Sequence, residues 1–133
     1  MITLDTSAVV ALANRGDPDH ARVNESFVED GGPYFVPTGI LAEVCYFLET
    51  RFHPDVLDAF LDHLERSLFT LDCGEGDLVR IRSLVRRYAD LPLGYADAAV
   101  IACAERFGGK VLTLDRHFTV VASEGAIEVF PSR

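Results

Sequence analysis

Short apolar runs alternate along the chain with longer segments in which apolar residues recur every three or four positions. The short runs predict buried strands, and the longer segments predict amphipathic helices. The predicted strands cover residues 2–4, 34–37, 68–72, 110–115 and 127–130. The predicted helices cover residues 6–14, 18–30, 39–50, 53–66, 75–90 and 95–107. Strands that alternate with helices predict an α/β fold in which helical layers cover a parallel sheet.

The same letters, TLD, occur at the ends of three predicted strands, where Asp5, Asp72 and Asp115 each stop an apolar run. Aspartate is a good turn and helix-capping residue, which would account for all three. In parallel α/β sheets, however, the ligand crevice lies at the carboxyl ends of the strands, near the point where strand order reverses. All three aspartates are therefore candidates for a site, and the local pattern does not distinguish them.

Two further acids lie on predicted helices. Asp97 falls between Ala104 and Ile101, within the apolar arc of its helix, where an ionised carboxylate is costly unless it is paired or bound to a metal. The free N–H groups of the first helical turn could also satisfy it, so both interpretations stay open. Glu43 lies at the border of its helix's apolar stripe, beside Phe47, where acids are usually just solvated. Together, these acids are the oxygen ligands that Mg²⁺ and Mn²⁺ prefer.

The composition narrows the classes of protein. A chain of 133 residues, 49% of them hydrophobic, fits a single domain spanning residues 1–133. No leader-like segment and no bilayer-length apolar run is visible, so we expect a cytoplasmic protein without membrane contact. The three cysteines lack CxxC spacing and form no zinc pattern with the four histidines, which indicates free thiols. The net charge of −9 argues against binding nucleic acid through bulk electrostatics.

Four blocks of the sequence resemble the motifs of PIN-domain ribonucleases, and specifically those of VapC-type toxins of toxin–antitoxin pairs. In chain order they are LDTSAVVAL with Asp5, LAEVCYFL with Glu43, LGYADAAVIACA with Asp97 and VLTLDRHF with Asp115. The resemblance implies a PIN-like three-layer α/β/α sandwich with a central parallel sheet of about five strands in the order 3-2-1-4-5. In that order the strands that end in Asp5 and Asp115 are neighbours, whereas Asp72 lies roughly 10 Å from the first strand.

The resemblance also implies an activity, the hydrolysis of RNA phosphodiester bonds by an Mg²⁺- or Mn²⁺-dependent endoribonuclease toxin. Asp5, Glu43, Asp97 and Asp115 would be its catalytic, metal-binding residues, and Asp5 and Asp97 the strongest candidates for direct ligands. The implied partners are a structured RNA such as tRNA or rRNA, a cognate VapB-type antitoxin and a second copy of the chain. The apolar helices between residues 39 and 64 could supply the surface of such a homodimer.

Other polar residues have weaker indications of a role. Thr6 and Ser7 could bond to the acids or to the scissile phosphate, although helix capping explains them equally well. Four arginines of one predicted helix form either a local RNA-facing patch or a solvated face that pairs with neighbouring acids. These are Arg80, Arg82, Arg86 and Arg87.

The sequence departs from the resemblance at His117, where many relatives carry another acid two residues after the fourth one. If that acid contributes to a second metal site in those relatives, its replacement by histidine favours one tightly bound metal here. The histidine could contact a phosphate, but we expect it to lie at the surface.

Two alternative functions stay open. One is a PIN-type nuclease that processes RNA outside a toxin–antitoxin pair, and the other is a non-catalytic module that binds RNA or a protein partner.

Overall fold

A computed structural model of the chain describes residues 1–132, which form a five-stranded sheet surrounded by helices. The strands are β1 (Ile2–Leu4), β2 (Tyr34–Pro37), β3 (Thr70–Asp72), β4 (Lys110–Leu112) and β5 (Glu128–Phe130). The α-helices are α1 (Thr6–Ala13), α2 (His20–Asp30), α3 (Leu41–Arg51), α4 (Pro54–Glu65), α5 (Leu78–Arg87), α6 (Tyr95–Arg106) and α7 (Arg116–Ala122). A short 3-10 helix, η1 (Thr38–Ile40), precedes α3.

The sheet has the predicted order, β3-β2-β1-β4-β5, and every neighbouring pair of strands is parallel. In the pairing of β1 with β4, Leu4 lies opposite Leu112. The register therefore brings the next residue, Asp5, level with Thr113, and Asp115 lies two residues further along. Strand order reverses between β1 and β4, so the crevice expected for such a sheet lies beyond these two carboxyl ends.

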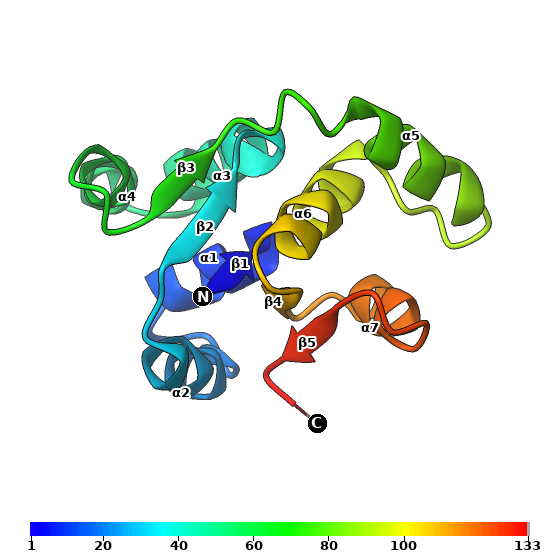
Figure 1. Cartoon of the computed structure of the whole chain (residues 1–133). Helices are drawn as coiled ribbons and strands as arrows, with labels where there is room; N and C mark the ends of the chain where they lie inside the picture. The colour runs from blue at the N-terminus through cyan, green and yellow to red at the C-terminus, as the bar shows by residue number, and fades with distance from the viewer. Residues whose placement is uncertain (133) are drawn as a thin grey trace.

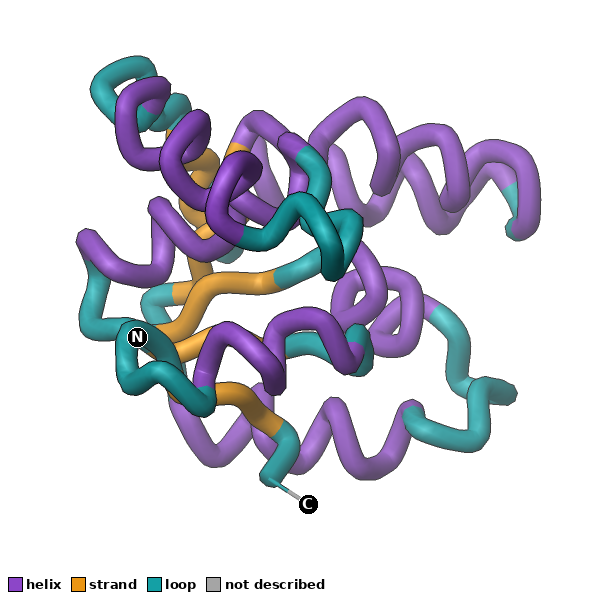
Figure 2. Tube along the Cα trace, turned by 90° about the vertical axis from the view of Figure 1, so that its right-hand side faces the viewer, coloured by secondary structure: helices purple, strands orange, loops and turns teal. Residues whose placement is uncertain are grey.

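Helices cover both faces of the sheet, as the α/β pattern predicts (Figures 1 and 2). In Figure 1, α2 and α4 lie to the left of the sheet, and α5 and α6 lie to the right. Helix α6 packs against β1, β2 and β4, and α5 packs on α6. All residues from Ala98 to Ala104 are buried, because α6 lies between the sheet and α5. The helix carries small residues that allow close approach: a Cβ atom on Gly39 of η1 would lie only 2.6 Å from that of Ala99.

The structure differs from the predicted elements in several places. Helix α7 is absent from the prediction, and β4 is three residues shorter than predicted because the chain turns after Leu112. Helix α2 begins at His20, since Asp17 Oδ1 accepts the N–H of Asp19 at 2.7 Å and forms a turn there instead of capping the helix. The Thr38 hydroxyl donates to the carbonyl of Cys73 at 3.1 Å, so its side chain does not cap the helix that follows.

The described residues share one continuous hydrophobic core, which includes side chains from β1, β2 and β4 and from every α-helix. This core supports a single domain over residues 1–133, although that boundary stays a prediction. All three cysteines are free thiols. No helix within residues 1–132 is long and apolar enough to cross a membrane.

Candidate metal centre

The carboxyl ends of β1 and β4 open into a cavity of about 460 Å³. Its lining includes all four acids that the sequence analysis selects, Asp5, Glu43, Asp97 and Asp115. These acids come from four separate parts of the chain, namely the start of α1, the first turn of α3, the first turn of α6 and the start of α7. We call this space the acidic cavity. The third TLD aspartate, Asp72, is not among its lining residues.

Asp5 is buried, with 5% of its surface exposed, and its side chain makes no capping hydrogen bond to α1. Asp5 does occupy the N-cap position of α1, where its backbone carbonyl accepts the N–H groups of Ala8 and Val9, but its side chain does not serve as the cap. Its Oδ2 instead accepts hydrogen bonds from the Thr113 hydroxyl at 2.8 Å and the Ser7 hydroxyl at 2.9 Å. Burial raises the pKa of Asp5 above its usual value, and the two hydroxyl hydrogen bonds oppose that rise. The two hydroxyls thus hold a desolvated carboxylate at the edge of the cavity.

Asp97 and Asp115 lie close together beside His117. One ligand atom from each of the three lies within 4.8 Å of the others. Burial raises the pKa of Asp97 to about 6, and the negative charges of Asp5 and Asp115 add to the rise, while His117 opposes it. Crowded carboxylates of this kind repel one another, and a bound cation would remove the repulsion.

The Asp115 carboxylate has a second role, because its Oδ1 accepts the backbone N–H of His117 at 2.9 Å and so caps α7. Here the capping explanation is correct, although it does not exclude a place in the acidic cavity. Glu43 is exposed on the first turn of α3, and within residues 1–132 its carboxylate has no hydrogen-bond or ion-pair partner. It is therefore free to face a ligand in the cavity.

Hydroxyl groups connect α1 to the segment after β4. The Ser7 Oγ accepts the N–H of Leu114 at 2.9 Å, and the Thr113 Oγ1 accepts the N–H of Asp115 at 3.0 Å. Sequence reasoning selected Ser7 but missed Thr113, which only the register between β1 and β4 reveals. The hydroxyl of Thr6 is buried and has no hydrogen-bond partner within the described chain.

Two charged residues of the acidic cavity were also missed, Asp17 and Arg51. The guanidinium of Arg51 lies 4.2 Å from the centre of the Phe47 ring, in a cation–π contact across one turn of α3. The positions of Glu43, Phe47 and Arg51 are spaced by four residues, so the sequence did contain a signal. They form one helical face that presents an acid, a ring and a cation to the same cavity.

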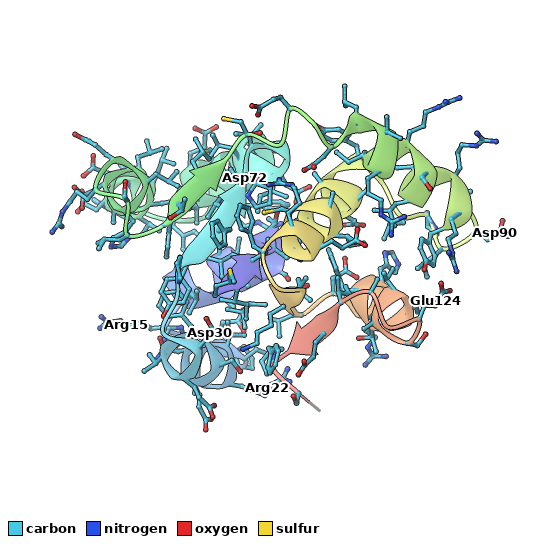
Figure 3. The ribbon with its side chains drawn as sticks, in the orientation of Figure 1. Arg15, Arg22, Asp30, Asp72, Asp90 and Glu124 are labelled. Carbon is cyan, nitrogen blue, oxygen red and sulfur yellow. The ribbon has the colours of Figure 1, made fainter. Side chains whose placement is uncertain are left out.

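The four arginines selected as RNA contacts have different surroundings in the structure. Arg80 donates two hydrogen bonds to Glu105, at 2.8 and 3.0 Å, and Arg87 pairs with Glu124. Figure 3 shows Glu124 and Asp90 on the side of the molecule occupied by α5 and α7. Arg82 and Arg86 line a separate hollow on α5. Their contact with RNA stays a prediction.

Asp72, by contrast, serves the fold. Figure 3 shows it between β3 and α6, where its carboxylate pairs with Arg106. The same guanidinium donates to Asp77 at 2.8 and 2.9 Å, so one arginine of α6 ties down both the end of β3 and the start of α5. The prediction that Asp72 lies outside the acidic cluster agrees with this arrangement.

The acids of the acidic cavity, together with the neighbouring His117, fit a divalent cation. Their oxygen atoms are the donors that hard cations prefer. The Nδ1 atom of His117 is buried without a hydrogen-bond partner in the described part of the chain, and it lies 3.7 Å from Asp115 Oδ1 and 3.9 Å from Asp97 Oδ2. The ring is 38% exposed, so it does lie at the surface as expected, but its Nδ1 atom faces inward toward two carboxylates.

Comparison with known proteins agrees with this architecture. Residues 2–124 match the PIN domain family. Ribonuclease VapC26 of Mycobacterium tuberculosis is 34% identical over 125 residues, which are 92% of this chain and 93% of that protein. The crystal structure of VapC20 of the same organism, described as a sarcin–ricin loop cleaving toxin, superposes with a TM-score of 0.80 at 19% identity over 91% of this chain and 95% of that one. FitAcB from Neisseria gonorrhoeae gives a TM-score of 0.62 at 22% identity over 98% of this chain and 96% of that one. The chain therefore belongs to the PIN-domain family and is of the VapC type.

Proposed function

We propose that the protein is a VapC-like endoribonuclease toxin that hydrolyses RNA phosphodiester bonds with Mg²⁺ or Mn²⁺ and is neutralised by a cognate antitoxin. The observation that carries the proposal is the convergence of Asp5, Glu43, Asp97 and Asp115 on one cavity at the sheet's reversal point. The similarity to a protein named as a ribonuclease supports the same reaction.

The residues of the acidic cavity would have different roles in the reaction. Asp5, Asp97 and Asp115 would hold the cation, and Glu43 would orient the attacking water. A divalent ion held there would lower the pKa of a water molecule and offset negative charge on the phosphate. The hydroxyls of Ser7 and Thr113 keep Asp5 in one orientation, which avoids reorganisation when the substrate arrives.

Arg51 provides a local positive charge through which an acidic chain could bind RNA. A net charge of −9 does not attract RNA over the whole surface, but a guanidinium at the rim of the acidic cavity can bind a phosphate locally. The Phe47 ring beneath it limits its movement. A bound cation would also cancel part of the negative charge of the four acids.

The expected partners follow from the family. VapC20 is described as cleaving the sarcin–ricin loop, and we propose a structured RNA, tRNA or rRNA, as the substrate here. An antitoxin segment that places an arginine in the acidic cavity would block binding of the cation or of the phosphate.

A homodimer also stays a prediction. On the expected surface, Tyr46 and Leu61 are 53% and 45% exposed, whereas Leu78 and Val79 of α5 are more exposed, at 65% and 85%. A cytoplasmic location stays a prediction as well.

Purified protein should cleave a 5′-labelled structured RNA at defined positions when Mg²⁺ or Mn²⁺ is present, and excess EDTA should stop the reaction because the carboxylates alone do not activate water. The fragments are read on a sequencing gel. Full activity in excess EDTA would rule out the proposed chemistry. A protein that neither cleaves RNA nor gains thermal stability from added metal would be a non-catalytic binding module.

Two observations in cells distinguish a toxin from an RNA-processing nuclease. A toxin should arrest growth when it is expressed, and co-expression of a small protein encoded next to it should restore growth. A processing nuclease should do neither. The cleavage assay gives the same result for both, so the growth experiment is needed to separate them.

An Asp72→Asn variant should cleave RNA at nearly the wild-type rate, because Asp72 lies outside the acidic cavity. It should lose about 1 kcal/mol of the free energy of unfolding, since Arg106 would keep its bonds to Asp77 and the Asp72 pair is partly exposed. Cleavage rates and urea denaturation measure the two quantities. A tenfold loss of rate in a folded variant would show that the assignment of the site is wrong.

A further inference from the structure

His117 occupies a position that the local backbone determines. Asp115 caps α7 by accepting the backbone N–H of His117. The same hydrogen bond places the His117 imidazole beside the Asp115 carboxylate. Asp97 reaches the same place from the first turn of α6. As a result, one ring nitrogen and two carboxylates meet although they come from two separate helices.

The contacts around Nδ1 are too long for hydrogen bonds. Its distances to Asp115 and Asp97 are 3.7 and 3.9 Å, and the atom is buried without a partner in the described chain. A buried polar atom without a partner costs free energy. Two ligand atoms that share one ion, with bonds of about 2.1 Å, can lie up to about 4.2 Å apart. Both observed distances are within that limit, so a cation could be shared between Nδ1 and either carboxylate, and the three groups lie close enough to form one candidate site.

We propose that Nδ1 of His117 is a direct ligand of the divalent ion, and that this nitrogen donor makes the site favour Mn²⁺ over Mg²⁺. The inference rests on the metal-dependent function proposed above and specifies its cofactor. Mg²⁺ takes oxygen ligands and keeps much of its water, whereas imidazole suits transition metals. A single histidine in place of an acid therefore changes the preferred ion while the other acids remain.

The first experiment measures the affinity of metal-free protein for Mn²⁺ and for Mg²⁺ by calorimetry. Wild-type protein should bind Mn²⁺ at least about tenfold more tightly than Mg²⁺, and His117→Asp should reduce that ratio at least about tenfold, since even outer contacts of a metal site change affinity by 10–100-fold. His63→Asp, on α4 and outside the acidic cavity, is the matched control and should keep the wild-type ratio.

The second experiment identifies the ligand atom directly. Pulsed electron paramagnetic resonance of the Mn²⁺-loaded protein should show coupling to an imidazole ¹⁴N nucleus, which His117→Asn should lose and His63→Asp should retain. Circular dichroism confirms that each variant is folded. A wild-type protein that binds Mn²⁺ without ¹⁴N coupling, or an unchanged affinity ratio in His117→Asp, would overturn the inference and leave the proposed function intact. If neither ion binds, the proposed function fails as well.

Discussion

An Asp5→Asn variant should lose RNA cleavage by at least about a hundredfold while it keeps its fold. The asparagine side chain has the same shape, and its oxygen can still accept the hydrogen bonds that Ser7 and Thr113 donate to Asp5. The other terminal atom becomes an NH₂ group, which carries no negative charge and cannot bind a cation. A hundredfold loss corresponds to about 2.7 kcal/mol of transition-state stabilisation, a modest value for a catalytic metal ligand.

Single-turnover cleavage of a structured RNA in saturating Mn²⁺ measures this effect, and thermal unfolding without metal confirms that the variant is folded. Asp72→Asn is the matched control, because it makes the same chemical change at the end of another strand with the same TLD sequence. A folded Asp5→Asn variant within tenfold of the wild-type rate would contradict the assignment of Asp5 as a ligand.

The second large effect concerns stability. An Asp97→Asn variant should be more stable than the wild type in EDTA at pH 7, by an amount of the order of 1–3 kcal/mol. Burial and the neighbouring charges raise the pKa of Asp97 from 3.8 to about 6, so the fold disfavours its ionised form. The unfolded chain ionises freely, and a neutral amide at this position avoids the cost. The gain amounts to several degrees in Tm.

The sign of the pH dependence follows from the raised pKa. Below pH 3.8 the carboxyl is protonated in both states and costs nothing. Between pH 3.8 and about 6 the unfolded chain loses its proton first, so the contribution of Asp97 to stability falls as the pH rises, and the full cost is present at pH 7. Wild-type protein should show this loss in EDTA, and Asp97→Asn should lack it.

Added Mn²⁺ should reverse the order of the two proteins. It binds the folded wild type and raises its Tm, whereas Asp97→Asn should gain little because a ligand is missing. Thermal scans of both proteins across pH 4–8, in EDTA and in Mn²⁺, test both statements. An Asp97→Asn variant that is less stable than the wild type in EDTA would show that the carboxylate contributes favourable structural bonds, such as the bond to the backbone of Gly94, that outweigh its repulsion.

Local pattern predicted most of the elements, because alternation of short apolar runs with amphipathic segments depends on neighbours in the sequence. It missed α7, whose seven residues, RHFTVVA, have modest helical propensity. That helix depends on the Asp115 cap and on the burial of Phe118 and Val121, which are consequences of the fold. The end of β4 was overestimated for a similar reason: Leu114 extends the apolar pattern, but Thr113 bonds to Asp5 just before α1 and Asp115 caps α7.

The acids of the candidate site were selected from the sequence by their positions at strand ends and helix starts, together with a family resemblance. Their partners were not. Thr113 and the inward-facing nitrogen of His117 became visible only in three dimensions, because each faces a carboxylate that is distant in the sequence. A single sequence contains no direct record of such contacts.

The sequence by itself determined that the letters TLD recur near the ends of three strands and that a parallel α/β sheet would bring strand ends together. Tertiary structure decided what each aspartate does. Asp5 accepts two hydroxyl bonds beside the acidic cavity, Asp115 caps α7 at the same cavity, and Asp72 pairs with Arg106 at the edge of the sheet. The three sites have the same local chemistry, and they differ because strand order and register give each carboxylate different neighbours.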